Sequence, residues 1–145
     1  MEELENLRKS IEAGNYEEAL AIVNELEEMS KEDKLQKIKS FMMVILLHLI
    51  KQQAEKRTTR SWDFSIRNAV REVQYINNRR KAGGTYASRE EIKEIIDYAY
   101  PTAIEKASLE AFEGIYTEKE LEKMIKPKQI RKQALALVME DATHP

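Results

Sequence analysis

The sequence contains no cysteine, which excludes disulfide bonds, thiolate metal ligands and a cysteine nucleophile. It has only four glycines and three prolines among 145 residues, too few for a fold of short strands joined by turns. Its longest apolar run, residues 41–50, is interrupted by His48 and falls well short of the roughly 20 residues of a membrane helix. We therefore expect a helical protein of the reducing cytoplasm that has no membrane span.

Residue patterns of catalysis and of cofactor binding are also scarce. The two histidines, His48 and His144, do not give the Glu-x-x-His spacing on two helices that a dimetal bundle uses. The pair Gly83-Gly84 lacks the lysine and the spaced third glycine of a phosphate-binding loop. The sequence therefore predicts no catalytic residue, no metal site and no cofactor. An enzyme with an unrecognised site is our third functional hypothesis.

What the sequence does contain is helix signals. Charged residues make up 34% of the chain and apolar residues 42%, which suits a core with a well-solvated surface. Capping residues precede apolar stripes that have helical spacing. The signals are Asn15 with Glu18, Ser30 with Asp33, Ser61, Ser88 with Glu91, Thr117 with Glu120, and Pro127. They predict helices near residues 2–13, 15–29, 31–55, 61–82, 88–114, 117–125 and from 127 onward.

This pattern predicts an all-α fold. No segment shows sustained two-residue alternation, so strands are not expected. The most apolar segment lies within residues 31–55, and we expect the other helices to pack around it. The predicted architecture is a single domain, residues 1–145, built as a bundle of six to seven helices around this central apolar helix.

Charge is distributed unevenly along the chain. Residues 1–33 carry three basic and eleven acidic side chains, a net −8, whereas residues 51–81 carry nine basic and three acidic ones, a net +6. The basic segment could neutralise nucleic-acid phosphates. Because the whole chain has a net charge of −2, we favour the simpler reading, in which acidic and basic helices offset one another. The possible basic patch consists of Lys51, Lys56, Arg67, Arg71, Arg79, Arg80 and Lys81.

Two short motifs resemble an uncharacterised family of mostly cyanobacterial proteins. They are Leu46-Leu47-His48-Leu49-Ile50-Lys51 and Arg60-Ser61-Trp62, with Arg57 between them, Ser65-Ile66 after them, and Ala99-Tyr100 with Ala103 further on. The combination is similar to the domain of unknown function that is numbered twenty-nine. The resemblance implies a small helical bacterial protein and assigns no activity or site residue.

The resemblance covers residues 1–125, which form the family-like core. After Ala107 an Ala-Ser-Leu-Glu-Ala run replaces the family's usual Glu-Thr-Gly-Leu. We expect residues 126–145 to form an extra C-terminal helix and a tail.

The family motifs direct attention to a candidate functional or structural cluster. Its members are His48, Arg57, Arg60, Ser61 and Trp62. A structural role is available, since Ser61 can cap a helix, Trp62 can anchor it in the core, and the arginines can bind the carbonyls at the end of the preceding helix. A binding site is the second interpretation, and we favour the structural one.

The leading functional hypothesis is a non-catalytic helical module that binds another protein. The expected partner is a different bacterial protein or a second copy of the chain, as a homodimer. The alternative is a nucleic-acid-associated regulator that uses the basic segment 51–81. The two hypotheses differ in how binding should respond to salt.

Overall fold

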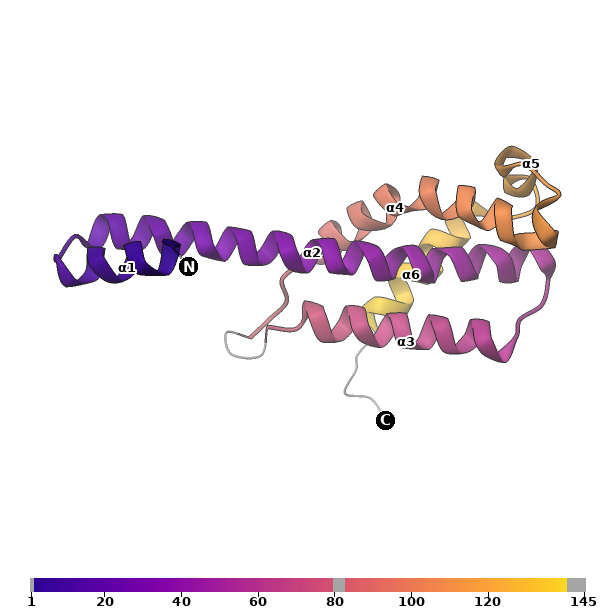
Figure 1. Cartoon of the computed structure of the whole chain (residues 1–145). Coiled ribbons are helices and arrows are strands. Elements are labelled where there is room, and N and C mark those ends of the chain that lie inside the picture. Colours follow the sequence, from indigo (N-terminus) through magenta and orange to yellow (C-terminus); the bar gives the residue numbers. More distant parts are fainter. Residues whose placement is uncertain (1, 80–82, 141–145) are drawn as a thin grey trace. The chain divides into compact units, whose positions relative to one another are not determined.

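The computed structural model describes residues 2–79 and 83–140. Within this part of the chain the regular structure is helical, apart from one antiparallel bridge between Asn78 and Thr85. The all-α prediction is therefore confirmed (Figure 1). The elements are α1 (Glu2–Glu12), α2 (Tyr16–Glu55), α3 (Arg60–Asn77), α4 (Arg89–Glu110), the 3₁₀ turn η1 (Ala111–Gly114), α5 (Glu118–Glu122) and α6 (Pro127–Met139).

Several helices begin where the sequence predicts. Ser88 and Thr117 each form a complete capping box, with Glu91 and Glu120 as their partners. Asn15 accepts a hydrogen bond from the backbone N–H of Glu18 at 3.3 Å and thereby caps α2. These contacts satisfy amides that the first turn of a helix otherwise leaves without acceptors.

The largest departure from prediction is α2, a single helix of 40 residues. Two helices were expected here, the second starting after Ser30, but residue 30 lies within α2 and the cap prediction is wrong. The segment between residues 16 and 55 contains no glycine or proline and is rich in Glu, Lys, Leu and Ala, which favour helix. A serine spaced three residues from an acid does not interrupt such a segment.

The described chain divides into two compact units between residues 34 and 35. The first unit consists of α1 and the beginning of α2. It buries Ser10 and Ala19, whereas Ile11 and Leu20 on its helices are more than half exposed. This unit has little core of its own.

The second unit contains the apolar core. The second half of α2 contributes fully buried Ile38, Met42 and Ile45, and in Figure 1 this half lies between α3 and α4. The central position predicted for the apolar segment is confirmed. Other core side chains come from α3 (Ile66, Ala69, Val73), α4 (Ile92, Ile96, Ala99, Ala103), α5 (Leu121) and α6 (Ile130, Ala134).

A buried asparagine fixes the connection between α3 and α4. The Oδ1 atom of Asn77 accepts from the backbone N–H of Ala87 at 2.8 Å, and its Nδ2 atom donates to the carbonyl of Ala87 at 3.4 Å. Both polar ends of this buried amide are thus hydrogen-bonded, as burial requires. The side chain holds the start of α4 beside the end of α3.

Candidate functional site

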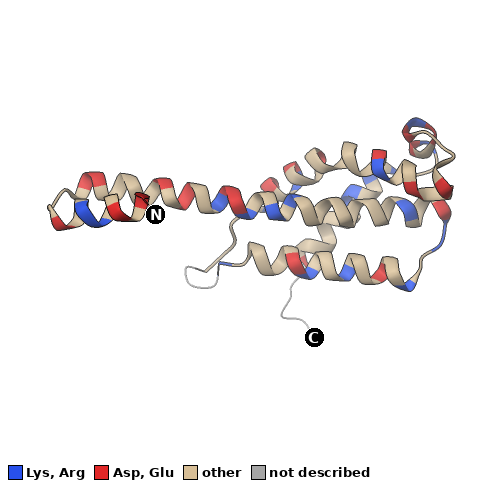
Figure 2. Cartoon of the chain, viewed as in Figure 1, with Lys and Arg blue, Asp and Glu red and all other residues tan. Residues whose placement is uncertain are grey.

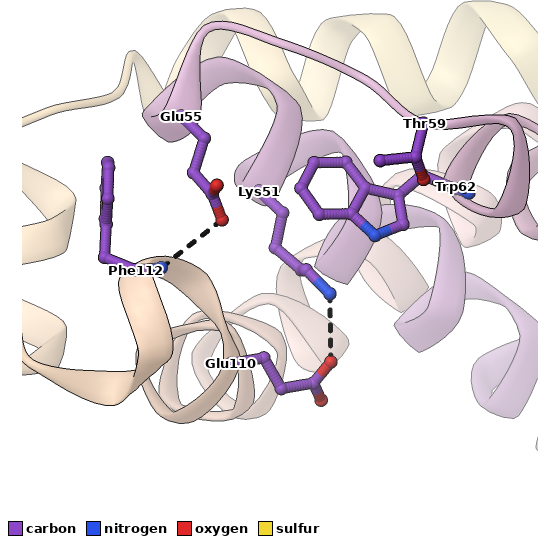
Figure 3. A network of polar contacts seen from close by, with 6 residues as sticks. All are labelled: Lys51, Glu55, Thr59, Trp62, Glu110 and Phe112. Carbon is purple, nitrogen blue, oxygen red and sulfur yellow. Dashed lines mark hydrogen bonds and ion pairs between the residues drawn. The ribbon is translucent and has the colours of Figure 1, made fainter.

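The end of α2, the start of α3 and the end of α4 meet at a corner, where Trp62 of the predicted cluster lies (Figure 3). Lys56 ends α2 in a left-handed conformation, with φ +55°, and the backbone N–H of Arg57 donates to the carbonyl of Gln52 at 3.3 Å. This bonding is that of a Schellman C-cap, in which a residue of positive φ closes the last helical turn. It turns the chain sharply toward α3.

The N-cap of α3 is Thr59, whose hydroxyl oxygen accepts from the backbone N–H of Trp62 at 3.0 Å. The prediction that Ser61 caps this helix is therefore wrong. Ser61 is exposed in the first turn, and Arg60, the first helical residue, is exposed as well. Both threonine and serine are good caps, and the sequence offers both within three residues.

Trp62 is half-buried and does not belong to the apolar core, so its predicted role as a core anchor is wrong. Two cations contact its ring instead. The Nζ atom of Lys51 lies 4.7 Å from the ring centroid, and the Cζ atom of Arg57 lies 4.8 Å from it. Each such cation–π contact stabilises by roughly 0.5–2 kcal/mol, so the indole is held in place while part of it faces solvent.

Lys51 is buried, with 7% of its surface exposed, and donates to Glu110 Oε1 at 3.0 Å. Its assignment to a solvent-facing basic patch is therefore wrong. A buried ammonium needs a counter-ion and hydrogen bonds because it has lost its hydration. The carboxylate of Glu110, at the end of α4, supplies both, and the pair joins α2 to α4 (Figure 3).

His48 lies one helical turn before Lys51, and its ring centroid is 6.4 Å from that of Trp62. Burial lowers the pKa of His48, the Lys51 cation lowers it further, and the Glu110 carboxylate partly opposes both effects. The imidazole is therefore neutral at pH 7. Its Nδ1 atom is buried and has no hydrogen-bond partner among the described residues.

A left-handed turn follows α4 and faces the end of α2. Phe112, Glu113 and Gly114 have φ values of +51°, +58° and +78°. Left-handed backbone costs a residue with a Cβ atom about 1–2 kcal/mol, so other contacts must hold Phe112 and Glu113 there. One is Glu55, whose Oε2 atom accepts from the Phe112 N–H at 3.3 Å while its Oε1 atom accepts from Arg57 Nε at 2.9 Å.

These elements enclose a groove of about 380 Å³. We call it the Trp62 groove; it is lined by Glu55, Arg57, Trp62, Glu110, Phe112, Glu113 and Ile115. Ile115 is 71% exposed, and Leu109 next to the turn is 72% exposed. Phe112 packs edge-on against Tyr116, with ring centroids 5.2 Å apart. The groove thus combines an aromatic face and an apolar edge with charged residues, of which Glu55, Arg57 and Glu110 are held by ion pairs.

The structure brings together three of the five predicted cluster residues, His48, Arg57 and Trp62. Three further residues of the site, Glu55, Glu110 and Phe112, were not predicted from the sequence. The one local signal for the turn was Gly114, because glycine favours positive φ. Lys51 and Glu110 are 59 residues apart in the sequence, so no local sequence pattern predicts their ion pair.

The other members of the basic segment are dispersed. Lys56, Arg67, Arg71 and Arg79 are exposed, and α3 carries acidic residues as well as basic ones (Figure 2). Arg80, Lys81 and His144 fall outside the described residues. Within residues 2–79 and 83–140 no group of three or more His, Asp or Glu side chains is placed to hold a metal ion.

None of the described helices combines the length and the apolar character needed to cross a bilayer. Comparison with protein families matches residues 4–133 to the domain of unknown function DUF29. The match begins in α1 and continues into α6. No curated protein matches the chain, and no solved structure matches it.

Proposed function

Because the chain belongs to DUF29, a family of unknown function, its role must be argued from its own residues, and we propose a non-catalytic helical protein-interaction module. The proposed binding surface is the Trp62 groove. The observation that carries this proposal is the partly exposed indole, which two cations hold beside exposed apolar side chains.

The composition of the groove supports this function. Tryptophan and arginine are the residue types most enriched at energetic hot spots of protein interfaces. Here Trp62 and Arg57 both line the groove, Ile115 adds largely exposed apolar surface to its lining, and Leu109 beside the turn is largely exposed as well. A rigid aromatic side chain loses little conformational entropy on binding.

The charges at the groove define what kind of partner fits. Three carboxylates line it, those of Glu55, Glu110 and Glu113. Glu55 is paired with Arg57 and Glu110 with Lys51, so these five charges together leave a net charge of −1 at the groove. Complementarity therefore favours a protein segment with an apolar anchor and flanking lysine or arginine side chains. The segment belongs to a second protein or to a second copy of this chain.

The test is site-specific photo-cross-linking in the native cell. Benzoylphenylalanine replaces Ile115 in the groove, and in a matched control it replaces Phe64, an aromatic residue of α3 that is 54% exposed and does not line the groove. We expect a discrete cross-linked product from position 115 that is absent from position 64. Its mass shows whether the product is a homodimer or contains another protein.

The identified partner is then purified and titrated against the wild-type chain and its variants. Trp62→Ala should weaken binding by at least tenfold, the typical effect of a hot spot, whereas Phe64→Ala should leave it unchanged. Equal cross-linking from both positions, or full affinity in Trp62→Ala, would show that the groove is not the binding surface.

A further inference from the structure

A second concave surface lies between α4 and α6, and it is rich in positive charge. The hollow has a volume of about 380 Å³ and is lined by four basic side chains, Arg89, Lys93, Arg131 and Lys132, with Asp97 as its one acid. This contrasts with the surrounding sequence, since residues 82–145 carry nine basic and twelve acidic side chains, a net charge of −3. Four cations around one small volume repel one another, and an anion bound there would relieve that repulsion.

Arg131 is held in a fixed position within this hollow. Its Cζ atom lies 4.3 Å from the ring centroid of Tyr100, a residue of α4 that is only 3% exposed. The Nε atom is buried and lies 3.7 Å from Asp97 Oδ1, which is within ion-pair range but too far for a hydrogen bond. The side chain as a whole is 39% exposed, so it is anchored by stacking and keeps hydrogen-bonding capacity.

The other three basic side chains that line the hollow are exposed and are not held by strong contacts with the described residues. Lys93 lies 3.5 Å from Glu90 in an exposed pair, and pairs of this kind contribute little. Arg89, the first residue of α4, and Lys132 are both exposed. These exposed side chains can therefore turn toward a ligand that is bound to Arg131.

Two apolar side chains complete the lining, Ile96 and Leu135, which are 2% and 7% exposed. Their exposed area is small, and the aliphatic stems of the arginine and lysine side chains add apolar surface, so the hollow suits a ligand with both an anionic and an apolar part. Guanidinium groups bind phosphate oxygens in a two-pronged geometry, and the volume lies in the range of small-molecule sites. We propose that this hollow binds a small molecule that carries phosphate groups and a planar or apolar part, of the mononucleotide type.

The direct test is calorimetric titration of the full chain at 50 mM salt with ADP, inorganic pyrophosphate and adenosine as probes. We expect saturable binding of ADP and weaker binding of pyrophosphate, because pyrophosphate lacks the apolar part. Adenosine should not bind measurably. In a parallel nuclear magnetic resonance titration, the backbone amides that ADP shifts should cluster on the first turns of α4 and on α6.

Two variants locate the site. Arg131→Gln should weaken ADP binding by at least tenfold, and Lys93→Gln combined with Lys132→Gln should do the same without disturbing the stacking on Tyr100. The matched control, Arg67→Gln with Arg71→Gln, removes two exposed cations from α3 and should leave binding unchanged. Circular dichroism of each variant verifies that it is folded.

Three results would overturn the proposal. The first is no saturable binding of ADP or pyrophosphate at millimolar concentration. The second is an equal loss of affinity in the α3 control, which would indicate general attraction of anions. The third is binding of a DNA duplex that Arg131→Gln abolishes, which would reassign the hollow to nucleic acid.

Discussion

At the scale of single residues, the ion pair between Lys51 and Glu110 affects both the stability of the fold and the shape of the Trp62 groove. Lys51 is buried, whereas the side chain of Glu110 is 40% exposed, so the two partners differ in how much hydration they have lost. Removing the carboxylate leaves a buried cation without an anion, while removing both charges does not. The same ammonium also contacts the Trp62 ring, so the stability of the pair and the shape of the groove are connected.

The first prediction concerns this pair. Glu110→Gln should lower the free energy of unfolding by about 1–3 kcal/mol, and Lys51→Met in the same chain should restore part of that loss. Urea denaturation of the single and double variants gives the coupling energy. The control Glu90→Gln removes the acid of an exposed pair and should change stability by less than about 1 kcal/mol. If Glu110→Gln and Glu90→Gln lower the free energy of unfolding equally, Lys51 is hydrated in the folded chain and does not need Glu110 as a counter-ion.

The second prediction concerns pH. The pKa of His48 is lower in the folded chain than its ordinary value of 6.5, so between the two values the unfolded chain binds more protons. The contribution of His48 to stability is therefore complete above pH 6.5 and is lost as the pH falls toward the pKa of the folded state. Wild type should lose more stability than His48→Gln between pH 7.5 and 5. Proton resonances of the imidazole should titrate with a midpoint below 6.5.

His48, Arg57 and Trp62 were predicted to lie together, and they do, but the predicted roles of Ser61 as a cap and Trp62 as a core anchor were wrong. Thr59 and Ser61 are both good caps, and only the geometry of the preceding turn decides between them. Trp62 follows the apolar spacing of α3, yet it lies near the helix start, beyond the side chains that form the core. The helical spacing of apolar residues predicts the face of the helix on which a side chain lies, but not how deeply that side chain is buried.

At the scale of elements, helix starts were predictable where local chemistry decides them. Ser88, Thr117 and Pro127 all begin helices as expected, because each acts through residues within one turn. Ser30 fulfils the same pattern but lies within α2. What distinguishes it is the continuous helix-favouring sequence on both sides, which outweighs a single cap signal.

The third prediction follows from this contrast. Ser88→Ala should lower the free energy of unfolding by about 1 kcal/mol because the amide of Glu91 loses its acceptor. Ser30→Ala should leave stability unchanged or raise it slightly, since alanine is the better helix former. Thermal melts of the two variants provide the comparison. A comparable loss in both would indicate a helix start near residue 30.

The fourth prediction concerns the left-handed turn after α4. Glu113→Gly should raise the free energy of unfolding by about 0.5–1 kcal/mol, because glycine adopts φ +58° without strain. Gly114→Ala should lower it by more than about 1 kcal/mol, since a Cβ atom there would lie 2.9 Å from the carbonyl oxygen of Leu109.

The control for the turn is Gly84→Ala. Gly84 also has a positive φ, +71°, but apart from its chain neighbours no atom of the described residues lies within 4 Å of the position of an added Cβ. Urea midpoints should therefore place Gly84→Ala between wild type and Gly114→Ala. If the two alanine variants are equally stable, the close contact with Leu109 is absent in solution.

At the scale of the whole molecule, composition was a good guide to fold class and a poor guide to function. The scarcity of glycine and proline, together with the capping signals, correctly gave an all-α chain. The basic segment, in contrast, divides between a buried lysine and exposed arginines, because neighbours in sequence can lie on different faces of a helix. The Trp62 groove depends on contacts among three helices, and no local pattern encodes them.

The fifth prediction tests the nucleic-acid alternative. We expect no measurable binding of a 20-base-pair duplex at 50 mM salt, because acidic side chains accompany the exposed Arg67 and Arg71 on α3. Fluorescence anisotropy of a labelled duplex is the measurement. Binding that weakens steeply with salt, by about 0.9 log units per phosphate for each log unit of salt, and that Arg67→Glu with Arg71→Glu abolishes, would favour the regulator.

The cation-flanked indole has a practical consequence. Trp62 is the only tryptophan in the chain, so the intrinsic emission excited at 295 nm originates from the groove alone. A protein segment that replaces water at this partly exposed ring should shift the emission to shorter wavelength. No tryptophan lines the hollow between α4 and α6, and a ligand there should leave the emission unchanged. An unlabelled optical titration can therefore show which of the two surfaces a ligand occupies.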